Sequence, residues 1–219
     1  MLINNKDFIE IEFTGKTKEG QIFDSNIKED LKEIDPKAEP KLFTFCLGQN
    51  MFLKGIEDFL IGKEIGEYEI ELKAKEAFGP RNPGLIQKMP IKIFIEQKLN
   101  PRPGITFNFD GRLGKVLTVS GGRILVDFNN PLAGRDIVYK IKVLRKVENI
   151  EERIKSLIDF FFRMDFKFEI EGKRVIIEAP KEVTKFIELF KDKFKEILNF
   201  DLEVKEIKQE KKENPAPKQ

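Results

Sequence analysis

Alternating hydrophobic and polar residues recur along the first 80 positions of the chain. The segment DFIEIEFTGK places Ile9, Ile11 and Phe13 on one side and acidic or hydroxyl side chains on the other. Successive side chains of a strand point to opposite faces, so this period of two predicts a half-buried strand. The same period occurs in QIFDS, KLFTFCLGQ and GEYEIELKA. Together these segments predict a sheet with one apolar face.

A change of period between the third and fourth of these segments predicts a short helix. In NMFLKGIEDFLIG, the residues Leu53, Ile56, Phe59 and Leu60 follow helical spacing, and Gly62 is suited to the C-terminal cap. Residues 26–40 are charged and contain two prolines, which predicts a surface excursion. AFGPRNPG has the turn residues of a loop.

Residues 85–131 differ from what precedes and follows them. Short apolar segments are cut there by NPRPG, DGRLG and SGG, which is typical of a small β-rich module. DIVYKIKVLRKV then resumes the alternation of the first segments. We therefore expect residues 1–84 and 132–148 to form one domain that carries residues 85–131 as an inserted domain.

The last part of the chain predicts a third, compact domain at 149–207. ENIEERIKSLIDFFFRM has a helical apolar stripe, with Asn149 as N-cap and Glu152 completing a capping box. A hairpin turning near Gly172, a second helix over 180–200 and the strand DLEVKEI follow, in the order αββαβ. Residues 208–219 have the composition of a disordered tail. The expected fold class is α+β.

The composition of the chain excludes several classes of binding site and cofactor. There are 40 basic and 38 acidic residues, so the net charge of +2 does not indicate a polyanion-binding protein. The chain has no histidine and one cysteine, which removes most zinc, haem and iron–sulfur options, and we expect no metal or cofactor. A single thiol cannot form an internal disulfide, and no apolar run reaches the roughly 20 residues of a membrane span. A cytoplasmic location is therefore expected, with Cys46 as a packing residue.

Four separated segments resemble, in order and spacing, an FKBP-type peptidyl-prolyl cis–trans isomerase. They are FTGKTKEGQIFDS, FTFCLGQNMFLKGIEDFLIG, GEYEIELKAKEAFG and DIVYKIKVL. The inserted module falls where SlyD-like members carry their insert-in-flap domain, and the last domain resembles the extension of long archaeal forms. The resemblance implies an FKBP antiparallel sheet with a short helix, and isomerase activity.

The resemblance also implies which residues form the catalytic pocket. They are Phe13, Phe23, Asp24, Phe43, Phe52, Leu53, Ile56, Phe78 and Tyr139. Phe13 and Phe78 stand where the family more often has tyrosine, and Ile56 stands where the simplest members have tryptophan. The absent hydroxyl at Phe78 implies weaker binding of small-molecule inhibitors.

This reaction explains how a chain without histidine can be an enzyme. Rotation about an amide costs about 18–20 kcal/mol because it destroys resonance, and no proton has to move. The planar amide is more dipolar than the twisted one, so a dry aromatic pocket disfavours the ground state relative to the transition state. Asp24 is expected at the pocket edge, orienting pocket groups or polarising the twisted carbonyl, without general acid–base work.

The inserted domain has more apolar residues than so small a module can bury well. Exposed apolar surface would bind unfolded or nascent polypeptides and present their prolines to the pocket. The candidate substrate-binding residues are Met89, Ile91, Ile93, Phe94, Phe107, Phe128 and Leu132. The alternative is that each of them forms the core of the module itself.

Two other functions stay open on the sequence. One is a binding-only chaperone whose isomerase pocket is degraded. The other, less favoured, is a nucleic-acid adaptor that uses Arg112, Lys115 and Arg123 of the inserted domain, where Asp110 and Asp127 dilute the positive charge. For the last domain, we expect dimerisation between two copies of the chain, or added chaperone surface.

Overall fold

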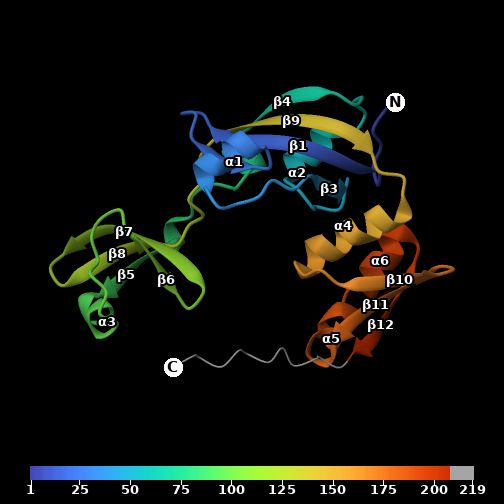
Figure 1. Cartoon of the computed structure of the whole chain (residues 1–219). Coiled ribbons are helices and arrows are strands. Elements are labelled where there is room, and N and C mark those ends of the chain that lie inside the picture. The colour runs from blue at the N-terminus through green and yellow to red at the C-terminus, as the bar shows by residue number, and fades with distance from the viewer. Residues whose placement is uncertain (208–219) are drawn as a thin grey trace, which may run out of the picture.

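The computed structural model describes residues 1–207 and contains three sheets, one for each expected domain (Figure 1). We call these parts the first domain, the insert domain and the C-terminal domain. The tail predicted to be disordered, 208–219, lies outside the described residues. The α+β fold class is confirmed.

The sheet of the first domain is completed by a strand that follows the insert. Its order is β2-β1-β9-β4, with β3 also pairing with β1, and β9 is antiparallel to both β1 and β4. The strands are β1 (Phe8–Thr17), β2 (Ile22–Ser25), β3 (Phe43–Cys46), β4 (Glu67–Leu72) and β9 (Ile137–Lys146). The predicted alternation holds, because Tyr139, Ile141 and Val143 of β9 are buried while Lys140 and Lys142 between them are exposed.

Two helices accompany this sheet. The predicted helix is α2 (Lys54–Leu60), whose Ile56 and Leu60 are fully buried. The segment expected to be only a surface excursion contains α1 (Lys28–Ile34), which packs beside β2. None of the residues of α1 is buried, so it has no apolar stripe by which the sequence pattern could have shown it.

The insert domain is a four-stranded antiparallel sheet in the order β5-β8-β7-β6. Its elements are β5 (Ile86–Pro90), α3 (Ile91–Glu96), β6 (Thr106–Phe109), β7 (Arg112–Ser120) and β8 (Arg123–Asp127). The sequence pattern did not predict α3, because its β-branched residues in IKIFIE are equally typical of a strand.

The C-terminal domain has one more helix than expected. Its elements are α4 (Ile150–Phe162), β10 (Lys167–Glu171), β11 (Arg174–Pro180), α5 (Lys181–Glu188), α6 (Lys191–Leu198) and β12 (Asp201–Ile207). The predicted second helix is divided at Leu189 and Phe190, so the order is αββααβ. At the break, the Phe190 ring packs against α4, with its centre 4.9 Å from that of Phe161 and 5.2 Å from that of Phe162.

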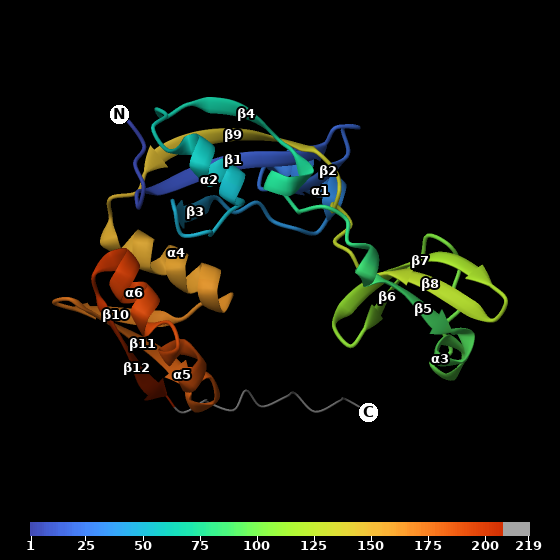
Figure 2. The same ribbon diagram turned by 180° about the vertical axis from the view of Figure 1, so that it is seen from behind.

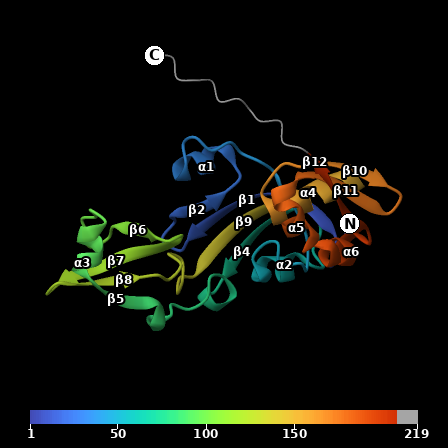
Figure 3. The same ribbon diagram turned by 90° about the horizontal axis from the view of Figure 1, so that it is seen from below.

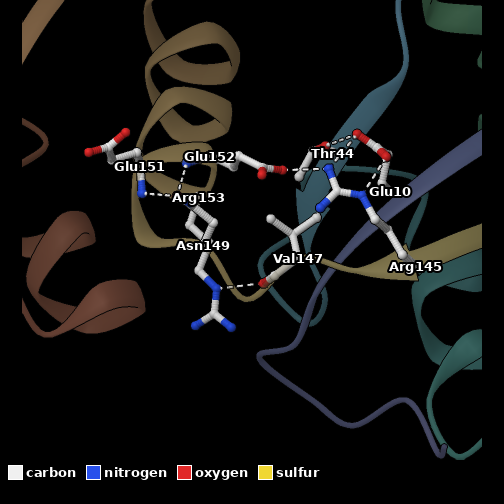
Figure 4. A network of polar contacts seen from close by, with 8 residues as sticks. All are labelled: Glu10, Thr44, Arg145, Val147, Asn149, Glu151, Glu152 and Arg153. Carbon is white, nitrogen blue, oxygen red and sulfur yellow. Dashed lines mark hydrogen bonds and ion pairs between the residues drawn. The ribbon is translucent and has the colours of Figure 1, made fainter.

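The start of α4 is tied to the end of β9 (Figure 4). Asn149 Oδ1 accepts the N–H groups of Glu151 at 2.8 Å and Glu152 at 3.2 Å, which confirms the predicted N-cap. The predicted capping box is wrong in its second half, because the Glu152 carboxylate pairs with Arg145 instead. Arg153 Nε also donates to the Val147 carbonyl at 2.7 Å.

The hydrophobic cores show how the three parts are joined. Ile11 and Phe45 of the first domain belong to the same buried cluster as Ile154 and Leu157 of α4. The insert domain has a separate core of Phe94, Val116, Ile124 and Val126. Figures 2 and 3 show the insert domain and the C-terminal domain beyond opposite ends of the first sheet. The C-terminal domain is thus a packed extension of the first domain, whereas the insert is an independent unit.

Candidate active site

An aromatic cavity of about 820 Å³ opens beside β1, β3 and the segment before α2. Its apolar lining includes Phe13 from β1, Phe43 from β3, and Met51 with Phe52 from the loop. The Phe13 ring lies 5.1 Å from Phe52 and 6.2 Å from Phe43. Such a lining binds an apolar ring and excludes water from it.

Asp24 is the acidic group that β2 contributes to this cavity. The Tyr139 hydroxyl donates a hydrogen bond to Asp24 Oδ2 at 3.1 Å. Burial raises the pKa of Asp24, and the hydrogen bonds from Tyr139 and from the Ser25 backbone partly offset this rise. Burial and the adjacent carboxylate together hold the pKa of Tyr139 well above its usual range, so the hydroxyl stays a donor.

The predicted pocket residues divide into two groups. Phe13, Asp24, Phe43 and Phe52 line the cavity. The other five, which do not line it, are Phe23, Leu53, Ile56, Phe78 and Tyr139.

The second group forms the support behind the cavity. Tyr139 lies 5.4 Å from Phe52 and 5.6 Å from Phe23, both ring to ring and edge-on. Phe23 in turn meets Phe78 at 5.8 Å. Ile56 is fully buried, and Leu53 is half-buried just before α2. All of these side chains belong to, or pack against, the buried cluster of the first domain.

Gly15 makes this close ring packing possible. A Cβ atom there would lie 2.8 Å from Tyr139 Cζ and 2.9 Å from Phe23 Cζ, distances that real contacts do not show. The glycine therefore has a steric role in β1 that the alternation of the strand did not reveal.

Glu57 is a structural residue that the sequence reasoning missed. It is 1 % exposed on α2, and its carboxylate accepts N–H groups from Gly48 at 2.7 Å, Asn50 at 3.2 Å and Phe52 at 2.7 Å. These bonds fix the loop that carries Phe52 into the cavity. The available signal was an acidic residue in the first turn of a helix that follows a glycine-containing loop.

Asn26 fixes the opposite side of the cavity. Its Oδ1 accepts the Phe13 N–H at 2.7 Å, and its Nδ2 donates to the carbonyls of Ile11 at 2.9 Å and Lys41 at 3.3 Å. Asn26 is buried, so the segment expected to be a surface excursion starts as a strut between β1 and the approach to β3.

The candidate substrate-binding residues of the insert domain differ in how far they are buried. Phe94 has no exposed surface and lies in the core of the domain, so its predicted role in substrate binding is not supported by exposure and stays a prediction. The candidates Met89, Ile91, Ile93, Phe107 and Phe128 pack partly buried around it, and Leu132 is half-buried. The side chains with most exposure are others, Ile95 at 63 % and Leu113 at 61 %.

Among the residues described, no His, Cys, Asp and Glu side chains gather in a group of three that could hold a metal ion. Within the same residues, no helix has the length and apolar character needed to cross a membrane.

An antiparallel sheet around a short helix, with an aromatic cavity at its side and a β domain inserted before its last strand, defines the FKBP class of folds. The family model for FKBP-type peptidyl-prolyl cis-trans isomerase matches residues 2–95, and the model for the FKBP26 IF domain matches residues 87–132.

Similar proteins agree with these matches. The FKBP-type 16 kDa peptidyl-prolyl cis-trans isomerase of Escherichia coli is 34% identical over 113 residues, which cover 49% of this chain and 74% of that protein. The short-type peptidyl-prolyl cis-trans isomerase of Methanocaldococcus jannaschii is 28% identical over 146 residues, 65% of this chain and 92% of the other. SlyD of Helicobacter pylori is 28% identical over 125 residues, 55% of this chain and 68% of the other.

The chain belongs to the FKBP-type peptidyl-prolyl cis–trans isomerase family, and it is a SlyD-like member with an inserted IF domain. The predicted family and enzyme class are thereby confirmed.

Proposed function

We propose that this isomerase acts on Xaa-Pro bonds of unfolded or nascent proteins and also holds these chains as a folding chaperone. The proline ring would occupy the aromatic cavity between Phe13, Phe43 and Phe52. The planar amide is more dipolar than the twisted one, so moving it from water into an aromatic site destabilises the ground state more than the transition state. This lowers the barrier to rotation, which is about 18–20 kcal/mol.

The observation that supports this catalytic site is the Asp24–Tyr139 pair at the cavity. A carboxylate with a raised pKa, fixed by one hydroxyl donor, lies beside the aromatic side of the cavity formed by Phe13, Phe43 and Phe52. It supplies an oriented negative charge close to the twisting amide without any proton transfer. The roles of the nine pocket residues remain part of the proposal.

The holding function rests on the insert domain. Ile95 and Leu113 expose most of their apolar surface there, while the core beneath them has only four fully buried residues. The outer strands β5 and β6 of its sheet also have unpaired edges within the described residues. An extended client chain can add to such an edge and cover the apolar side chains.

The experiment has one arm for each activity. Exchange NMR on a short Phe-Pro peptide measures isomerisation, and light scattering of an aggregating unfolded protein measures holding. Asp24→Ala should slow isomerisation by about tenfold or more while holding persists. Ile95→Ser with Leu113→Ser should weaken holding severalfold and slow proline-limited refolding more than peptide exchange. The matched control is Ile65→Ser, an apolar residue 42 % exposed in the first domain and away from both proposed surfaces.

The outcomes separate the alternatives. If the wild-type protein holds clients but accelerates no peptide, it is a binding-only chaperone with a degraded pocket. If the double variant holds clients as well as the Ile65→Ser control, the insert domain is not the holding surface.

Two further parts of the proposal concern assembly and location. The C-terminal domain exposes Phe186 at 48 % and Leu189 at 77 %, which supports a homodimer formed through this domain. The solution mass of the wild type against that of a Phe186→Glu, Leu189→Glu variant tests this. A cytoplasmic location is supported by the single cysteine of the chain.

A further inference from the structure

One wall of the catalytic cavity does not come from the isomerase domain. Residues of α4 in the C-terminal domain line the same cavity as Phe13, Asp24, Phe43 and Phe52. They are Glu152, Lys155, Ser156, Asp159 and Phe160 of α4, together with its C-cap residue Arg163. The side of α4 that faces this cavity thus carries one half-buried aromatic ring, Phe160, among charged groups.

This wall is attached firmly enough to act as part of the site. Lys41 Nζ, in the segment before β3, lies 2.5 Å from Asp159 Oδ2. Arg145 of β9 bridges Glu10 of β1 and Glu152 of α4 (Figure 4). Below these ion pairs, the buried face of α4 is continuous with the core of the first domain. Polar and apolar contacts therefore fix the distance between α4 and the aromatic floor.

Some of the charged side chains on this wall have ion-pair partners and others do not. The acidic groups Asp159, Glu152 and Glu10 have basic partners. Lys155 and Arg163 are exposed and make no ion pair with any residue of the described part of the chain. Asp165 lines the adjoining depression with both and is not paired with either. Among the groups that line the cavity itself, Lys155 and Arg163 are therefore the basic groups without an ion-pair partner in the described part of the chain, and Asp24 is the acidic group on the opposite wall.

We propose that α4 is the second wall of the substrate groove and sets its sequence preference. Phe160 contacts an apolar side chain next to the isomerised proline, while Lys155 and Arg163 favour a client segment with an acidic residue near it. This inference rests on the isomerase activity at the aromatic cavity. The groove that reads the client chain is thus shared between two domains, so specificity and catalysis reside on different parts of the chain. Opposite charges across a cleft with apolar walls attract more strongly than on an open surface.

The test uses the full chain and two peptides that differ only in Glu or Lys two residues from the proline, on each side in turn. Exchange NMR gives the catalysed rate for each peptide. We expect the wild type to prefer the Glu peptide by about three- to tenfold at low salt, and the preference to shrink as salt screens the charges. Lys155→Glu combined with Arg163→Glu should reverse it.

Lys185→Glu is the matched control, because Lys185 is an exposed lysine of the same domain that does not line the cavity. It should keep the wild-type preference. Phe160→Ala should raise KM for a peptide with an apolar residue beside the proline more than for one with glycine there, with less effect on kcat.

Equal rates for the Glu and Lys peptides in the wild type, or the same preference in the charge-reversed variant, would overturn the inference while leaving the isomerase site intact. A wild type that accelerates no peptide would overturn the isomerase site itself, and the inference with it.

Discussion

The hydroxyl of Tyr139, behind the aromatic cavity, donates a hydrogen bond to Asp24 Oδ2 at 3.1 Å. The two residues lie on β9 and β2, which are separated in sequence by the whole insert domain. The ring of Tyr139 also meets Phe13, Phe23 and Phe52 within 6.0 Å. Tyr139 thus both holds the Asp24 carboxylate in place and packs against three of the aromatic rings around the cavity.

Removing this hydroxyl should slow catalysis in a protein that still folds. Tyr139→Phe keeps the ring but leaves the Asp24 carboxylate without its side-chain donor, at a cost of about 1–3 kcal/mol. We expect kcat/KM for a Phe-Pro peptide to fall about tenfold, measured by exchange NMR. Tyr68→Phe is the control, because the Tyr68 hydroxyl donates only to the exposed Glu64 carbonyl at 2.7 Å. Equal activities of the two variants would argue against the pair.

Acid should titrate Asp24 at a higher pH than an exposed aspartate. Because burial raises its pKa above the ordinary 3.8, we expect kcat/KM to fall as pH is lowered through that raised pKa. Asp24→Asn should remove this acid limb and leave a low, flat profile. A wild-type profile that is flat down to pH 4 would show that the ionised carboxylate does not contribute.

The raised pKa of Asp24 also determines in which direction the free energy of unfolding changes with pH. The folded-state pKa of Asp24 lies above its unfolded value, so the ionised form costs stability at neutral pH. That cost is fully present above the folded pKa and disappears as pH falls below 3.8. In urea titrations, the free energy of unfolding of the wild type relative to Asp24→Asn should therefore increase as pH falls through this window.

Glu57 should be essential for the loop that carries Phe52. In Glu57→Gln, an amide replaces the carboxylate that accepts three backbone N–H groups, and its own N–H₂ faces donors. We expect a loss of about 2–4 kcal/mol in the free energy of unfolding, and a higher KM because Phe52 is no longer fixed. Glu64→Gln, at an exposed position, is the control and should change neither quantity.

Cys46 should react only when the first domain opens. Its side chain is fully buried, and burial together with the nearby Glu57 carboxylate raises the pKa of the thiol to about 12. Alkylation at pH 8 should therefore be slower than for a free thiol by at least a hundredfold, and urea should restore it. Rapid labelling of the native protein would contradict the packing described here.

The alternating segments made the sheet of the first domain predictable, because one buried face imposes a period of two on Ile9, Ile11 and Phe13. The insertion was predictable because β9 resumes that period. Elements without such a face were not. None of the residues of α1 is buried, and α5 and α6 are separated at Leu189 and Phe190, where the Phe190 ring packs against that of Phe162.

The site was predictable only in part. The aromatic residues followed from a resemblance of four segments. Glu57 and the α4 wall depend on contacts between residues far apart in space or sequence, such as Lys41 with Asp159, for which no local pattern exists. Lys155 and Arg163 look like ordinary solvated residues until the helix is docked beside β3.

The place of β9 between β1 and β4 has a consequence for synthesis on the ribosome. The central strand of the first sheet emerges only after the insert domain, whose separate core contains no residue from outside 86–128. The insert can therefore fold first, while β1 and β4 wait without the strand that joins them. During translation, the part of this enzyme that we propose to hold other chains would be complete before the part that catalyses.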